Sequence, residues 1–193
     1  MKRFLLSLIF LTTSISLVAQ SNHMTFKGVP IDGSLDAYVK NMQKAGFTYL
    51  GKDDGIAILT GDFAGFRNCK VGVVTLKSLD LVNRISVLFD SHDKWAEVYS
   101  VYSQLKDMLS TKYGDPSQCV EEFQGYTQPR DDNARMHELN MDRCVYSTLF
   151  SVDTGDIELE IINQGFPEGA AVRLSYWDKI NTASVQKQAM DDL

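Results

Sequence analysis

The sequence predicts an α+β fold of two degenerate repeats, each a helix followed by an antiparallel meander, packed as one curved sheet with the helices on one face. Two segments carry apolar residues at the 3.6-residue spacing of a helix that buries one side. Each precedes several short segments that alternate apolar and polar residues and are separated by turn residues. Short strands joined by tight turns pair as antiparallel neighbours. The order helix, sheet, helix, sheet therefore indicates an α+β domain.

The first half begins with a predicted helix. Ser34 is suited to cap its start and Gly46 to end it. One helical face carries the apolar residues Leu35, Tyr38, Val39 and Met42. Turn residues such as Asp53 and Gly55 separate the strand candidates that follow. These strands are expected at 47–51, 55–63, 67–76 and 82–89.

A longer helix is predicted for about 94–113, because apolar residues recur along one face from Trp95 to Leu109. Gly114 ends this helix, and Pro116 prevents it from resuming. Strands are expected at 119–123, 143–152, 156–163 and 170–177. The tail 179–193 has a loosely helical spacing and is expected either to dock as a short helix or to fray.

Short motifs recur in the same order in the two halves, about 25–90 and about 93–178. Lys44-Ala45-Gly46 matches Lys112-Tyr113-Gly114, and Phe63-Ala64-Gly65-Phe66 matches Phe123-Gln124-Gly125-Tyr126. This arrangement resembles the β-lactamase-inhibitor-protein type of architecture, in which tandem αβ modules join into one curved sheet. The chain is also similar to small exported proteins of Bacteroides-like bacteria, whose leaders often end in Ala-Gln as Ala19-Gln20 does here.

The first 19 residues have the pattern of a secretory signal peptide. A basic start, Met1-Lys2-Arg3, precedes an apolar run at 4–18, and Ala19 is a small residue suited to cleavage. The alternative is a membrane anchor, but this run is shorter than the roughly 20 residues that span a bilayer. We therefore expect a mature protein in the periplasm or the medium, with one α+β domain at 20–178 and no membrane span.

The charge of the mature chain argues against two classes of partner. Cleavage removes Lys2 and Arg3 from the 19 basic side chains and leaves 17 against 25 acidic ones, a formal net charge of −8. A negative protein is repelled by phosphate backbones and by anionic lipid headgroups. We expect no nucleic-acid partner.

Three cysteines, Cys69, Cys119 and Cys144, remain in a compartment where disulfides persist. Either all three are small buried hydrophobes, or one pair forms a bridge. Cys119 and Cys144 are the favoured pair, because both lie in predicted strands of the same half. A cysteine hydrolase that uses Cys144 with His137 is an alternative function. The chain lacks the Gly-x-Ser-x-Gly turn that presents a nucleophile, and we expect no catalytic residues.

The sequence offers little support for a metal or a cofactor. Its three histidines, His23, His92 and His137, are isolated from one another, and no Gly-x-Gly-x-x-Gly loop is present. We therefore expect neither a metal nor a cofactor. Glu158 and Glu160 alternate with apolar residues, which is typical of a strand with one solvated face rather than of paired catalytic carboxylates.

The second half carries an insertion, 127–141, that the first half lacks. It is polar, has mostly no strand pattern and is expected to be a functional loop. Aromatic residues at strand ends are further candidates for an interaction surface. The candidate binding residues are Tyr126, Arg130, Asp131, Asp132, Arg135, His137, Phe66 and Phe166.

Export, the lack of a convincing catalytic set and this one insertion together favour a non-enzymatic binding protein of the envelope or medium. It would use the curved sheet face and the 127–141 loop, and the expected partner is a protein. An envelope scaffold or a carrier with a small-ligand pocket between sheet and helices stays open as an alternative.

Overall fold

The structure is a computed structural model that describes residues 22–191, apart from 54, 77–78 and 166. The predicted signal peptide and the candidate residue Phe166 lie outside the described residues. The first half contains β1 (Thr25–Phe26), β2 (Val29–Pro30), α1 (Leu35–Lys44), β3 (Thr48–Asp53), β4 (Ile56–Phe63), β5 (Phe66–Leu76) and β6 (Leu81–Leu88). The second contains α2 (Trp95–Tyr113), β7 (Gln118–Phe123), α3 (Asp132–Asn140), β8 (Cys144–Val152), β9 (Gly155–Gly165), β10 (Gly169–Asp178) and α4 (Lys179–Asp191).

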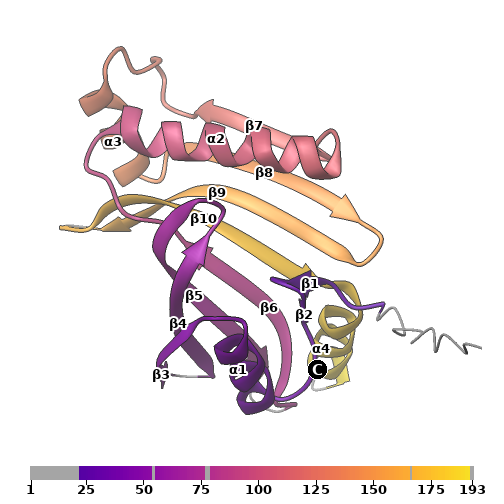
Figure 1. The fold of residues 1–193 in the computed structure, drawn as a ribbon. Helices are drawn as coiled ribbons and strands as arrows, with labels where there is room; N and C mark the ends of the chain where they lie inside the picture. The colour runs from indigo at the N-terminus through magenta and orange to yellow at the C-terminus, as the bar shows by residue number, and fades with distance from the viewer. Residues whose placement is uncertain (1–21, 54, 77–78, 166, 192–193) are drawn as a thin grey trace, which may run out of the picture.

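Eight strands form one antiparallel sheet in the order β3-β4-β5-β6-β10-β9-β8-β7, and β1 pairs with β2 in a separate hairpin. The predicted α+β class with an antiparallel sheet is confirmed. In the first half α1 is followed by β3–β6, in the second half α2 is followed by β7, α3 and β8–β10, and the last strands of the halves, β6 and β10, pair at the centre (Figure 1). This shared order does not test whether the sequence was duplicated, so the repeat stays a prediction.

One face of the sheet carries the hydrophobic core. Ile85 and Val87 of β6 lie opposite Tyr176 and Leu174 of β10, and all four are buried. The buried faces of α1, α2 and α3 belong to the same cluster, so these helices cover this side. Tyr102 of α2 anchors its helix through a buried hydroxyl–hydroxyl hydrogen bond of 2.5 Å to Thr148 of β8. Each large apolar side chain buried in this way contributes about 1.5–3 kcal/mol.

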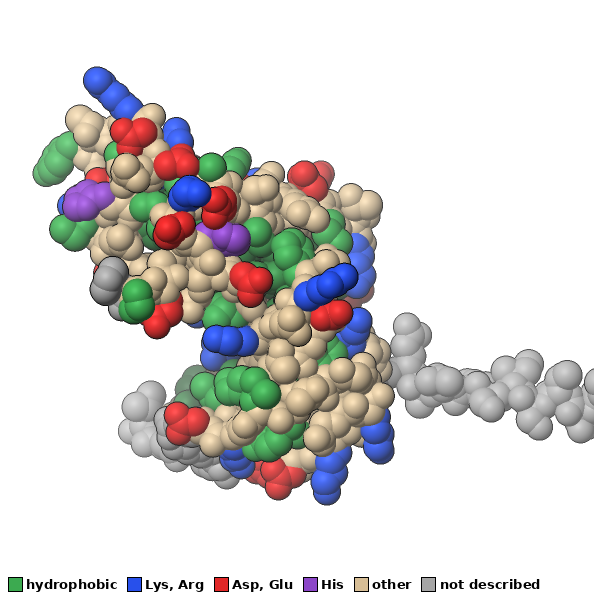
Figure 2. Space-filling view, turned by 60° about the vertical axis from the view of Figure 1, so that its left-hand side comes forward, with side chains coloured by type: hydrophobic (Ala, Val, Ile, Leu, Met, Phe, Trp, Pro, Cys, Tyr) green, Lys and Arg blue, Asp and Glu red, His purple; other side chains and the backbone are tan. Residues whose placement is uncertain are grey.

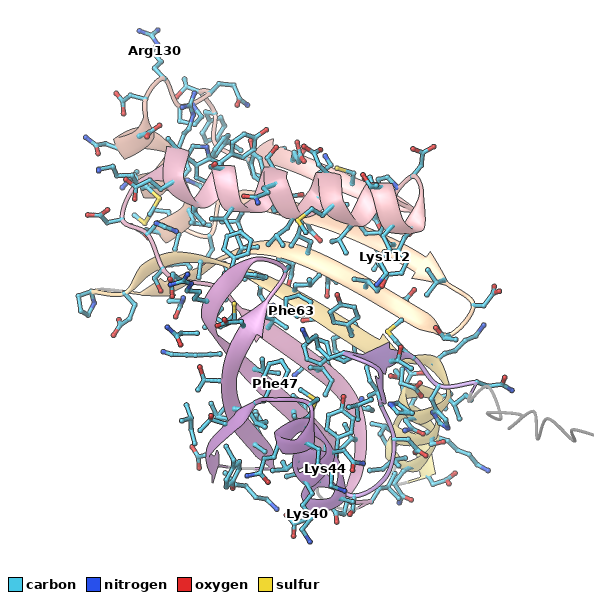
Figure 3. All side chains as sticks on the ribbon, viewed as in Figure 1. Lys40, Lys44, Phe47, Phe63, Lys112 and Arg130 are labelled. Carbon is cyan, nitrogen blue, oxygen red and sulfur yellow. The ribbon has the colours of Figure 1, made fainter. Side chains whose placement is uncertain are left out.

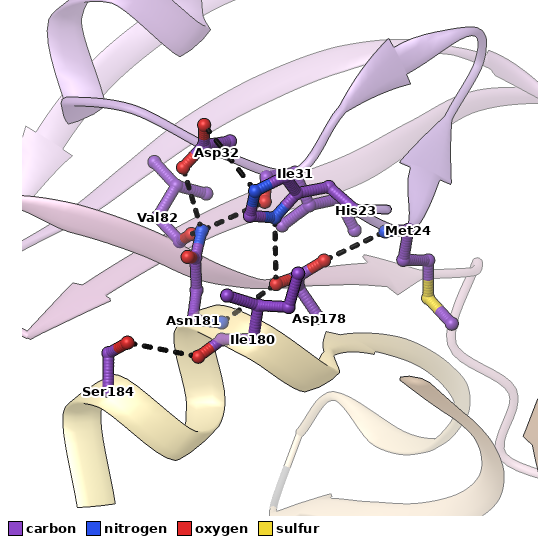
Figure 4. A network of polar contacts seen from close by, with 9 residues as sticks. All are labelled: His23, Met24, Ile31, Asp32, Val82, Asp178, Ile180, Asn181 and Ser184. Carbon is purple, nitrogen blue, oxygen red and sulfur yellow. Dashed lines mark hydrogen bonds and ion pairs between the residues drawn. The ribbon is translucent and has the colours of Figure 1, made fainter. Parts of the chain in front are cut away.

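A buried polar network joins both ends of the described chain (Figure 4). Asp178, at the end of β10, is completely buried. Its carboxylate accepts hydrogen bonds from the backbone N–H groups of Met24 and Asn181, both at 2.8 Å, and lies 3.1 Å from the ring Nδ1 of His23. The amide of Asn181 donates to the carbonyl oxygen of Val82 at 2.9 Å. The network therefore fastens α4 and the segment before β1 to the start of β6.

The insertion 127–141 is largely helical rather than a loop, which corrects the expectation from its polar composition. The side chain of Asp131 caps α3 by accepting a hydrogen bond from the backbone N–H of Ala134 at 2.9 Å. Met136 and Leu139 are buried three positions apart on its inner face. Only two apolar side chains hold this short helix, so its sequence has little of the periodicity that marks α1 and α2.

Candidate binding surface

Neither α1 nor α2 covers the opposite face of the sheet; α4 contacts β6, β9 and β10 at one end, where its Thr182, Ala183 and Gln186 line a pocket with Trp177 and Asp156. Antiparallel register arranges the side chains of this opposite face in three rows, and we call this grid the open face. One row is Arg84–Trp177–Asp156, the next is Ser86–Ser175–Glu158, and the third is Leu88–Arg173–Glu160, each running from β6 through β10 to β9. Apart from buried Ser175, these side chains are half-buried or exposed. The sheet therefore presents a mixed polar and apolar surface on this side.

Arg84 lies on the open face without a carboxylate partner. The central carbon of its guanidinium is 4.5 Å from the centroid of the Trp177 ring, in cation–π geometry. No described residue forms an ion pair with it, and its buried Nε lacks a hydrogen-bond partner. Burial and the nearby charge of Arg173 lower the pKa of Arg84. A partly desolvated guanidinium stacked on tryptophan is a group that gains from an added acceptor.

In the two neighbouring rows, the polar side chains have hydrogen-bond partners within the protein. Both Nε and Nη2 of Arg173 donate to one carboxylate oxygen of Glu160, at 3.0 and 2.7 Å, and the hydroxyls of Ser86 and Ser175 lie 3.0 Å apart. Burial, with a smaller contribution from the charge of Glu160, raises the pKa of Glu158. Glu158 and Glu160 share a partly solvated strand face, and neither faces the other across a cleft.

Half-buried aliphatic side chains flank the charged grid on both sides. Ile56 and Val74 of β4 and β5 lie in the row of Arg84, while Leu149 and Val120 of β8 and β7 lie in the rows of Glu158 and Glu160. Apolar groups beside an arginine–tryptophan pair resemble the centre of many protein interfaces.

The insertion lies on the other side of the sheet, since the buried side chains of α3 join the core under α2. The 127–141 segment and the open face therefore do not form one continuous surface. Tyr126 is fully exposed, and Arg130 extends away from the body of the molecule (Figure 3). His137 is also exposed. Phe66 is half-buried and packs against Phe89 at a ring-centroid distance of 5.0 Å.

Three of the predicted binding residues of the insertion have structural contacts. The carboxylate of Asp132 accepts a hydrogen bond from the backbone N–H of Ala96 at 3.2 Å and pairs with Arg135 at 3.3 Å. Asp131 is the cap of α3. The bond from Ala96 attaches α3 to the start of α2, and the other two contacts lie within α3. In Figure 2, the upper part of this end of the molecule carries acidic, basic and histidine side chains with apolar ones between them.

A groove of about 750 Å³ lies along α2, beside α3; we call it the α2–α3 groove. Trp95, Tyr99 and Tyr146 supply its aromatic side, and Asp132 and Arg135 supply its α3 side. Tyr99 is 38% exposed, whereas Trp95 beneath it is buried. This groove brings together two predicted binding residues and two tyrosines that the sequence did not single out. The signal was available in Tyr99, an aromatic residue at the edge of the apolar stripe of α2.

The cysteine predictions do not agree with the geometry. Cys119 lies opposite Thr148 and Cys144 lies opposite Phe123, so the two are four positions apart along β8. That offset is about 13 Å at the rise of a strand, beyond the roughly 7 Å that a disulfide spans. All three cysteines have free thiols, and the favoured bridge is absent.

The structure also argues against Cys144 as a nucleophile. Burial raises the pKa of its thiol to about 12, which disfavours the reactive thiolate. No described hydrogen bond joins it to His137, whose side chain is exposed.

Comparisons with protein-family models, with curated proteins and with solved structures found no match to this chain. The two resemblances inferred from the sequence therefore stay predictions. None of the described helices is long and apolar enough to cross a membrane. Within the described ranges, no three histidine, cysteine or acidic side chains gather closely enough to hold a metal ion.

Sequence reasoning did not identify Arg84, although a signal for it exists. Arg84 is the one charged residue in the apolar stretch 81–89, at a position where alternation assigns it to the face opposite Ile85. A charged residue in a central strand is unusual unless it forms an ion pair or lies on a binding surface.

Proposed function

We propose that this protein is an exported, non-enzymatic binding protein that captures a protein partner on the open face of its sheet. The observation that carries the proposal is Arg84, which lies on Trp177 in the central strand pair, on the face that α1 and α2 leave uncovered, and which has no carboxylate partner among the described residues. Tryptophan and arginine are enriched among the residues that dominate binding energy. A partner that supplied a carboxylate or a carbonyl oxygen to Arg84 would satisfy the donor that the free protein leaves open.

The size of the sheet around the open face supports a protein partner. Eight strands at a spacing of about 4.8 Å extend over about 34 Å, and three rows of side chains extend over about 20 Å along the strands. Their product is about 700 Å², close to the roughly 800 Å² that each partner buries in an interface of standard size. The flanking aliphatic residues would exclude water around the central arginine.

Site-specific photo-crosslinking in the native host tests the proposal. A photoreactive phenylalanine analogue replaces Leu149 on the open face in one variant and Met108 on the outer side of α2 in the control. Both side chains are accessible, Leu149 half-buried and Met108 44% exposed. We expect a discrete protein adduct from position 149 that is lost when Arg84→Ala is added. The proposal would be contradicted if only position 108 formed adducts, or if Arg84→Ala did not reduce the adduct from position 149.

Export is tested separately. Amino-terminal sequencing of the protein from fractionated host cells should recover a chain that starts at Gln20, outside the cytoplasm. Recovery of an intact Met1 from the cytosol would remove export from the proposal and leave the open face to be judged by crosslinking alone.

A further inference from the structure

We propose that the α2–α3 groove binds a neutral oligosaccharide. This site lies on the opposite side of the sheet from the open face and does not depend on the protein partner proposed above. The groove follows α2 from Trp95 to Asp107. Twelve residues of helix extend over about 18 Å, long enough for about three sugar rings in a row.

The aromatic side of the groove is a rigid platform. The ring of Tyr99 lies nearly parallel to that of Trp95, at 16° and 6.2 Å between centroids, and meets the ring of Tyr146 edge-on at 89° and 5.9 Å. Trp95 is held in turn by Phe123 at 5.0 Å. Tyr99 therefore keeps a fixed orientation while part of its ring faces solvent. A flat, preorganised ring of this kind stacks on the C–H face of a pyranose at low cost in entropy.

The polar side of the groove matches hydroxyl groups. Ser100, Ser103, Gln104 and Asp107 line it over successive turns of α2, and no described residue hydrogen-bonds to their side chains. They offer both donors and acceptors, as a polyhydroxylated ligand requires. Arg135 donates one hydrogen bond to Asp132 and retains further donors of its guanidinium. With Asp107, the lining carries two carboxylates and one guanidinium, which disfavours an anionic ligand.

The lining argues against the other common occupants. Among the described residues that line it, Ala96 is the only aliphatic one, and none is leucine, isoleucine, valine or methionine. An amphipathic helix or an acyl chain needs several such side chains to bury its apolar surface. Aromatic rings with hydroxyl, amide and carboxylate groups, and almost no aliphatic surface, are the combination expected for a sugar.

The test is a titration of the ¹⁵N-labelled mature chain, 20–193, followed by NMR. The probes are cellotetraose, maltotetraose, xylotetraose and the tetramer of N-acetylglucosamine, with decanoate as an acyl-chain probe. We expect at least one tetrasaccharide to shift amide signals of α2 and α3 with a Kd of about 1 mM or tighter. No shifts from any tetrasaccharide at about 10 mM, or shifts of these signals by decanoate alone, would overturn the proposal.

Variants locate the site. Tyr99→Ala and Gln104→Ala should each weaken the binding of that tetrasaccharide at least about tenfold, while Tyr99→Phe retains the ring and should retain most of the affinity. Met108→Ala changes an exposed side chain of the same helix outside the groove and serves as the matched control. If Tyr99→Ala fails to fold, Gln104→Ala decides alone. Unchanged affinity in a folded Gln104→Ala and Tyr99→Ala pair, or equal loss in Met108→Ala, contradicts the assignment.

The test of sugar binding can fail or succeed independently of the test of protein capture on the open face. Arg84→Ala on the open face should leave the affinity for the tetrasaccharide unchanged, and Gln104→Ala should leave the protein adduct at position 149 unchanged.

Discussion

Replacement of Asp178 by alanine should destabilise the fold more than any single change on the surface. The carboxylate of Asp178 is inaccessible to solvent and lies near three donors from two distant parts of the chain. Two of them are backbone N–H groups, those of Met24 and Asn181, which cannot rotate away to find water. Asp178→Ala therefore removes the acceptor without removing the donors.

The magnitude follows from the orphaned donors. Each buried N–H left without an acceptor costs about 1–3 kcal/mol. The bond to Asn181, three positions along at the start of α4, also acts as an N-cap, whose loss typically costs about 1 kcal/mol. These contributions overlap, and together they indicate a loss of about 4 kcal/mol in the free energy of unfolding. That is a large part of the 5–15 kcal/mol typical of a domain.

Urea unfolding followed by far-ultraviolet circular dichroism measures this loss. The control is Asp191→Ala, which removes an exposed carboxylate from the other end of α4 and should change stability by less than about 0.5 kcal/mol. Asp178→Asn keeps one acceptor oxygen but points an amide donor at the remaining donors, so its cost should lie between these two. A loss below about 1 kcal/mol in Asp178→Ala would refute the reasoning, because the donors would then have found other partners.

Three further predictions concern other parts of the fold. Gly155→Ala should cost at least about 2 kcal/mol in urea unfolding, because its Cβ would lie 1.9 Å from a carbonyl oxygen of β10; Gly72→Ala, whose Cβ meets only ordinary contacts from 3.6 Å, should cost less than about 1 kcal/mol. In the native protein, a maleimide should label exposed Cys119 well before Cys144, whose pKa burial raises to about 12; equal rates by peptide mapping would contradict this. Glu158→Gln should gain stability relative to the parent as pH rises from 4 to 7, since a raised pKa means that the native state binds its proton more tightly and loses stability above the ordinary value of 4.5. If the difference in free energy of unfolding between Glu158→Gln and the parent did not change with pH, Glu158 would have the same pKa in the native and unfolded states.

The helices and strands with strong local signals could be predicted from the sequence. The apolar spacing after Ser34 and before Gly46 predicts α1, and the structure places a helix at Leu35–Lys44. The longer stripe that ends at Gly114 likewise predicts α2, found at Trp95–Tyr113. In both cases local periodicity, cap residues and buried faces agree, so a short segment of sequence contains the whole signal.

The helix of the insertion could not be predicted in this way. α3 has two buried apolar residues, Met136 and Leu139, among polar neighbours, and its stability depends on contacts with α2, β8 and β9. The short β1–β2 hairpin is a similar case, because Phe26 is ordered by packing against Phe63 and Tyr176 at 5.1 and 5.5 Å. Where a segment is ordered by contacts with residues far along the chain, its own sequence shows no apolar periodicity.

The candidate surfaces were harder to predict, because both depend on which strands become neighbours. Trp177 and Arg84 are 93 positions apart, and only the pairing of β10 with β6 places them side by side. Alternation within each strand does assign each residue to a face. It does not give the order of strands, so it could not bring the arginine to the tryptophan. Tyr99 and Tyr146 meet for the same reason, through packing of α2 on β8.

The same pairing explains why the insertion and the open face are separate. A sheet in which every second side chain enters the core has only two surfaces, and α1, α2 and α3 occupy one of them. An insertion that contributes to that core, as α3 does through Leu139, must lie on the helical side. The insertion therefore extends the helical layer and creates a groove there, while the opposite face carries the partly exposed row of Arg84, Trp177 and Asp156. Two surfaces separated by a packed sheet can bind different ligands without competing for the same side chains.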